Sequence, residues 1–144
     1  MTEAERQAET HFSRIGGAPA VGRLVEAFYE RMDTLAEART IRAMHLADLG
    51  PTKAILKDYL GEWLGGPRLY SQKRGHPRLR MRHARFAIGP AERDAWMLCM
   101  RGALQEAVAD ASLREEIERK LFQLADWVRN DKDNPHDNNH AKDR

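Results

Sequence analysis

Residues 75–83 read GHPRLRMRH and place three arginines and two histidines within nine positions. Around this stretch the apolar residues Leu79 and Phe86 stand seven positions apart, which is the spacing of one helical face rather than the alternation of a strand. The spacing predicts a short helix around residues 76–83 with His83 on its inward face. What an inward histidine beside arginines can do depends on the elements around it.

Two long helices are predicted before this stretch. Residues 19–32 and residues 51–64 each begin with a proline, which suits a first helical turn, and the second segment ends before a Gly-Gly pair. The apolar residues of the second segment form a stripe wide enough to predict burial of that helix on more than one side. The apolar positions of the two segments are Val21, Leu24, Val25, Phe28, Met32, Ile55, Leu56, Tyr59, Leu60, Trp63 and Leu64. Between them, residues 34–50 read as a long loop, and loops of that length often carry function.

Two more long helices are predicted after it. Residues 89–108 begin with Gly-Pro, and residues 112–130 place Ser112 and Glu115 in capping-box spacing. Their apolar positions are Trp96, Met100, Ala103, Ala107, Leu113, Ile117, Leu121, Leu124 and Val128. With a less regular helix near residues 4–14 and no strand pattern, the fold class is predicted to be all-α.

Composition bounds the class of protein. The chain has 144 residues and 42% hydrophobic content, enough for one domain, which we place at residues 1–130, followed by a polar tail, residues 131–144, that we expect to be disordered. The net charge of +2 is too small to predict nucleic-acid binding by the molecule as a whole. The single cysteine, Cys99, excludes an internal disulfide. Because neither a signal peptide nor a membrane span is visible, we expect a soluble, cytoplasmic protein without membrane association.

Three minor motifs favour ordinary structural roles. His136 and His140 have the spacing of a zinc-protease pair, but their surroundings are too polar to form the rigid helix that such a site needs. Cys99 stands among apolar residues and is predicted to be a small core residue. The stretch GGAPAVG, residues 16–22, lacks the lysine of a phosphate-binding loop and the spacing of a dinucleotide-binding motif.

The basic stretch leaves three interpretations open. Residues 68–85 contain seven lysines and arginines and no acid, so they could form a cofactor-free helical module that binds nucleic acid, with Tyr70 and His76 interleaved. An inward His83 is a different use of the same residues: it can be a core histidine with its hydrogen bonds satisfied. It can also ligate haem iron while arginines hold the propionate groups.

The order of motifs resembles that of a truncated haemoglobin of the second group. The blocks IGGAP, LVEAFYERM, HLADL, YLGEWLGGPRLY, GHPRLRMRH and RDAWMLCMRGAL are similar to that family in sequence and in order, over roughly residues 12–108. The resemblance implies a globin-like two-over-two helical sandwich that encloses haem b, iron protoporphyrin IX. It also implies that His83 is the proximal iron ligand.

The resemblance assigns the distal side of this haem residue by residue. Tyr29 matches the distal tyrosine and Trp96 the tryptophan that many members place over the haem, and both side chains can donate hydrogen bonds. His45 stands where the family often has phenylalanine or tyrosine, at the start of the distal loop. Thr52 and Leu56 match the remaining distal positions. Because some other members have a polar residue where Leu56 stands, Leu56 should exclude water from that side of the distal pocket.

Further contacts with the haem are implied by the same resemblance. Arg82 matches a propionate partner, and Arg80 stands nearby on another helical face. The remaining residues that we expect around the haem are Met44, Leu56, Tyr59, Leu79, Phe86 and Trp96. The two Gly-Gly pairs, at 16–17 and 65–66, match the sharp turns of the family.

The function that the resemblance implies is binding of oxygen, other diatomic ligands or peroxide at a five-coordinate iron. Distal donors slow the release of oxygen, which favours oxygen-linked redox work, nitric oxide dioxygenation or peroxide reduction, over simple transport. Such work needs a reductase that the sequence does not identify, and we expect a monomer or a homodimer. Nucleic-acid binding through residues 68–85 is the alternative.

Overall fold

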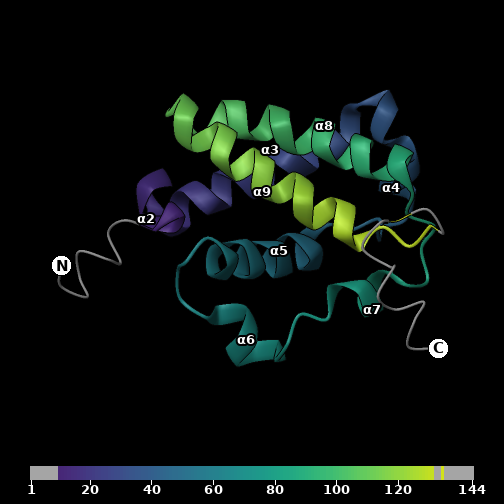
Figure 1. Cartoon of the computed structure of the whole chain (residues 1–144), viewed down its shortest axis with the longest axis horizontal. Coiled ribbons are helices and arrows are strands. Elements are labelled where there is room, and N and C mark those ends of the chain that lie inside the picture. Colours follow the sequence, from purple (N-terminus) through teal and green to yellow (C-terminus); the bar gives the residue numbers. More distant parts are fainter. Residues whose placement is uncertain (1–9, 132–133, 135–144) are drawn as a thin grey trace.

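The fold consists of two layers of helices. The computed structural model describes residues 10–131 and residue 134, and within these residues all regular structure is helical, as predicted. The long helices are α3 (Gly17–Thr34), α5 (Gly50–Trp63), α8 (Pro90–Ala107) and α9 (Ala111–Val128). Helix α3 packs on α8 and on α5, and α8 packs on α9. In Figure 1, α8 and α9 run across the top of the view and α5 lies beneath them.

Short helices connect the long ones. They are α2 (His11–Ile15), the 3-10 helix η1 (Ala36–Ala38), α4 (Arg39–Ala43), α6 (Leu69–Arg74) and α7 (Leu79–His83). Helices α6 and α7 lie beneath α5 in Figure 1. Helix α7 confirms the short helix predicted around residues 76–83, although it begins at Leu79.

The core lies where α3 crosses α8. The apolar stripe predicted on α3 is buried, and Phe28 is fully inaccessible to solvent. Met100, Ala103 and Leu104 of α8 are also fully buried. Cys99 is part of the same cluster and its burial raises the pKa of the thiol, which agrees with a core cysteine rather than a reactive one.

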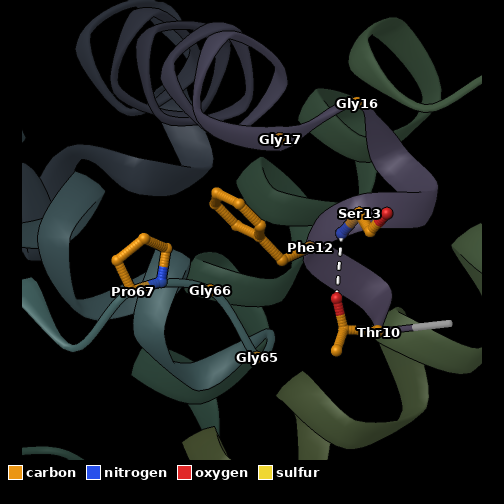
Figure 2. A pocket seen from close by; sticks show the side chains of 8 residues that line it. All are labelled: Thr10, Phe12, Ser13, Gly16, Gly17, Gly65, Gly66 and Pro67. Atoms are coloured by element: carbon orange, nitrogen blue, oxygen red, sulfur yellow. Dashed lines mark hydrogen bonds between the residues drawn. The ribbon is translucent and has the colours of Figure 1, made fainter. Parts of the chain in front are cut away.

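The two Gly-Gly pairs meet at one aromatic ring. Gly16 and Gly17 have φ of 114° and 73°, a conformation that allows the sharp turn from α2 into α3. A Cβ atom on Gly66 would lie only 2.6 Å from the ring of Phe12, so this position accepts only glycine without a shift. Figure 2 shows Phe12 between the two turns, in a surface pocket of about 670 Å³. None of the predicted site residues lines this pocket.

Four local predictions need correction. Residues 34–50 are not a plain loop, because they contain η1 and α4. Ala38 of η1 and Ile41 of α4 are buried and pack these short helices on the core. Helix α9 begins at Ala111, since the Asp110 side chain accepts from the Leu113 N–H at 3.1 Å, and the expected capping box at Ser112 is wrong. Helix α6 was not predicted. Ile55, one of the positions in the apolar stripe predicted on α5, is 41% exposed and faces solvent.

The ends of the chain are described only in part. Of the helix predicted near residues 4–14, the structure describes α2, and residues 1–9 lie outside the described residues. Of the tail predicted to be disordered, Asp131 and Asn134 are described. Asn134 is 2% exposed, and its Nδ2 donates to the carbonyl of Arg129 at 2.6 Å. The other tail residues lie outside the described residues.

Candidate functional site

An aromatic cluster forms the side of the candidate site that is built on α3. The Tyr29 ring is 4% exposed and lies edge-on to Phe28, with ring centroids 4.9 Å apart. Phe28 in turn lies 5.2 Å from the ring of Trp96 on α8, and Tyr29 lies 5.9 Å from the ring of His45. Burial raises the pKa of Tyr29, so its hydroxyl stays protonated and can donate. The structure thus brings Tyr29, His45 and Trp96 into one aromatic cluster, with Phe28 between Tyr29 and Trp96.

His45 has a defined tautomer in this arrangement. Its Nδ1 lies 2.8 Å from the carbonyl oxygen of Ile41. Because a carbonyl oxygen only accepts, Nδ1 carries the proton and Nε2 of the neutral ring is an acceptor. Burial lowers the pKa of His45; the bond to Ile41 opposes this, and the charges of Arg42 and His83 lower the pKa further. His45 is therefore neutral at neutral pH. Its Nε2 can accept a proton but has none to donate.

Arg42 fixes the segment that carries His45. Its Nη1 and Nη2 donate to the carbonyls of Leu46 and Ala47, each at 3.0 Å, and its Nε donates to Asp33 at 2.8 Å. No sequence pattern indicates this role of Arg42, because two of its three partners are backbone carbonyls, which carry no sequence signal.

His83 faces the site from α7. Its Nδ1 lies 2.6 Å from the carbonyl oxygen of Leu79, so Nδ1–H donates within the helix and Nε2 keeps its lone pair. His83 is half-buried and lies close enough to His45 for its charge to lower the pKa of that residue. The two histidines therefore lie in the same region of the molecule.

The two arginines of α7 differ in position. Arg82 is exposed, and its Nε donates to the carbonyl of Pro77 at 2.8 Å. Arg80 instead lies over the ring of Trp127 on α9, at 5.5 Å from the centroid. Arg82 is thus exposed and bonded to its own segment, whereas Arg80 is turned toward α9.

The apolar side chains predicted around the haem are only partly buried. Leu56, Tyr59 and Trp96 pack on the core with one side only. Tyr59 also lies 5.6 Å from the ring of Tyr70, and burial raises its pKa to about 12. The half-buried side chains among the predicted contacts are Met44, Leu56, Tyr59, Leu79, Phe86 and Trp96.

The basic stretch is partly neutralised within the protein. Asp58 on α5 pairs with both Lys73 and Arg74, each at 3.0 Å. Arg85 lies over the ring of Phe86, at 4.9 Å from the centroid. These contacts turn much of the stretch toward its own fold and do not favour the nucleic-acid alternative.

The described residues hold no cluster of three metal-ligating side chains, while His136 and His140 lie outside them. No helix among the described residues is long and apolar enough to cross a membrane.

Comparison with known proteins identifies the family. Residues 10–130 match the bacterial-like globin family. The group 2 truncated haemoglobin of Bacillus subtilis is 36% identical over 99 residues, which cover 69% of this chain and 73% of that protein. The group II 2-on-2 haemoglobin of Agrobacterium tumefaciens is similar in structure, with a TM-score of 0.81 and 49% identity over 84% of this chain and 94% of that one. The chain therefore belongs to the bacterial-like globin family, as a truncated haemoglobin of the second group.

A second solved structure supports the two-over-two fold. The cold-adapted truncated haemoglobin of Pseudoalteromonas haloplanktis has a TM-score of 0.83 and 35% identity, over 85% of this chain and 99% of that one. Globins of this family bind haem, oxygen and other diatomic ligands. The site fits such a group, because Nδ1 of His83 is bound to a carbonyl and leaves Nε2 for another partner, His83 lies in the same region as His45 of the aromatic cluster, and the apolar side chains predicted around the haem are only half-buried.

Proposed function

We propose that this protein binds haem b with His83 as the iron ligand and works in oxygen-linked redox chemistry rather than oxygen transport. The observation that carries the proposal is the 2.6 Å contact between His83 Nδ1 and the Leu79 carbonyl. A metal-binding histidine commonly donates its second ring N–H to a carbonyl, which fixes the tautomer and the ring orientation. The alternative of a core histidine would need a partner for Nε2 as well.

The distal residues would determine which ligand is retained. Haem iron held by one imidazole offers a further position to oxygen, other diatomic ligands or peroxide. Tyr29 and Trp96 are donors that stabilise negative charge on such a ligand, while Leu56 keeps water away from it. Slow release of oxygen follows, and it supports nitric oxide dioxygenation or peroxide reduction over transport. His45 adds an acceptor that can take a proton from peroxide.

The remaining contacts support the cofactor and its turnover. Met44, Tyr59, Leu79 and Phe86 would contact the macrocycle through their half-buried faces, and Arg82 would bind a propionate at the rim. Turnover needs electrons from a reductase, which we expect to be a cytoplasmic partner. The chain would act as a monomer or a homodimer.

The test is the visible spectrum of the purified protein. Expressed with adequate haem, the wild type should be red with a Soret band, and His83→Ala should lose haem or bind it weakly. Arg119→Ala, which removes an exposed arginine from α9, is the matched control and should keep its haem. A colourless wild type that resists reconstitution with haem and binds DNA would overturn the proposal in favour of the nucleic-acid module.

A further inference from the structure

Helix α7, which carries His83, is weakly anchored in the fold. None of its residues is fully buried. Among the described helices, α9 is the one with which α7 makes more than minor contacts. In Figure 1, α7 lies below the C-terminal end of α9 and apart from the crossing of α3 and α8. The position of His83 therefore depends on the end of α9 and on the residues that follow it.

Asn130, two residues beyond α9, binds the backbone on both sides of the turn that follows His83. Its Nδ2 donates to the carbonyls of His83 at 3.1 Å and of Phe86 at 2.6 Å. Its Oδ1 accepts from the N–H of Ile88 at 2.9 Å, and its own N–H donates to the Ile88 carbonyl at 2.9 Å. The orientation of the amide is fixed by these partners, since carbonyls only accept and the N–H only donates.

The residues around Asn130 give it a rigid base. Arg129 is 6% exposed and is held by Asp126 at 2.7 Å and by Asp131 at 2.9 Å. The Arg129 carbonyl accepts from Arg80 of α7 at 3.4 Å, and Arg80 also lies over Trp127. The segment from Trp127 to Asp131 thus holds α7 by its backbone at one end and by Arg80 on its side.

We propose that Asn130 is a positioning residue for His83. The bond to Leu79 sets the imidazole within α7, and Asn130 sets α7 on the protein, so that Nε2 is held in one direction. Without the amide, α7 and the turn after it are able to shift as a unit. The inference rests on the proposed role of His83 as iron ligand.

The direct test is the iron–histidine stretching band of the ferrous, ligand-free protein, measured by resonance Raman. Asn130→Ala removes all the side-chain bonds, and Asn130→Asp keeps the acceptor for Ile88 but loses both donors. We expect both variants to shift or broaden the band, and to speed haem transfer to an acceptor protein by on the order of tenfold. Gln123→Ala, which removes an exposed amide from α9, is the matched control and should leave the band and the transfer rate unchanged.

A detached ligand shows whether Asn130 acts through His83. In His83→Gly supplied with imidazole, the ligand is not linked to the chain, so adding Asn130→Ala should not move the iron–imidazole band. A shift as large as in the parent protein would overturn the proposal, because Asn130 would then act on the haem by another route.

Failure of the inference differs from failure of the proposed function. If His83→Gly without imidazole loses the wild-type band but Asn130→Ala leaves band and transfer rate unchanged, His83 stays the ligand and Asn130 is not a positioning residue. If His83→Gly without imidazole retains the wild-type band, the proposed role of His83 is itself overturned. Slower exchange of the Ile88 amide proton in the ferric wild type than in Asn130→Ala would confirm that the amide holds the turn.

Discussion

The two sides of the candidate site are built in different ways. On the distal side, Tyr29 extends the fully buried core around Phe28, so packing sets its position. On the proximal side, α7 has no fully buried residue and is fixed by hydrogen bonds, from His83 to Leu79 and from Asn130 to the turn. Close-packed interiors resist displacement, whereas exposed polar contacts exchange with water. The position of Tyr29 therefore depends on the stability of the whole fold, whereas the position of His83 does not.

The largest difference between the two sides should appear in stability. Phe28→Ala should lower the free energy of unfolding by about 3–5 kcal/mol, because it opens a cavity beneath Tyr29 and Trp96. Met81→Ala on α7, where the side chain is 61% exposed, should change it by less than about 0.5 kcal/mol. Urea unfolding of both ferric proteins, followed by circular dichroism, measures the two losses. Similar losses would mean that the two sides are equally part of the core.

An intermediate effect is expected from the distal donors. Trp96→Phe keeps most of the apolar bulk but deletes the indole N–H, so oxygen should dissociate about 10- to 150-fold faster, as for loss of one hydrogen bond to a charged acceptor. Tyr29→Phe should act in the same direction, and the double variant should not be additive because the two donors share one pocket. Stopped-flow displacement of oxygen by carbon monoxide compares all four proteins. An unchanged rate in Trp96→Phe would make the tryptophan a packing residue.

The smallest effect concerns pH and His45. Because burial lowers the pKa of His45 in the folded protein, the unfolded chain binds its proton more readily. The stability that this residue contributes is present above its ordinary pKa of about 6.5 and is lost as the pH falls through its lower folded value. His45→Phe should flatten the acid side of the stability profile and remove a spectral transition of the ferric protein below about pH 6.5. Identical titrations in both proteins would place His45 outside the distal pocket.

Sequence patterns predicted the parts of the molecule that depend on local periodicity. The stripe of α3 predicted a buried helix. The order of motifs placed Tyr29, His45 and Trp96 in one region, where the ring of Tyr29 meets that of His45 and Phe28 lies between Tyr29 and Trp96. The short helices η1, α4 and α6 escaped prediction because long-range burial, as of Tyr70 beneath Tyr59, stabilises them more than their own sequence does. Asn130 escaped for a related reason. Its partner His83 lies 47 positions away, and a backbone carbonyl leaves no trace in the sequence.

The contact between His83 Nδ1 and the Leu79 carbonyl also bears on the reduction potential of the proposed site. A carbonyl is a neutral acceptor, so it orients the ring without drawing the proton away. A neutral ligand compensates less of the charge of ferric iron than an anionic ligand does. Haem iron held by His83, as proposed, would therefore favour the ferrous state, and the proposed electron donor would not need to be a strong reductant.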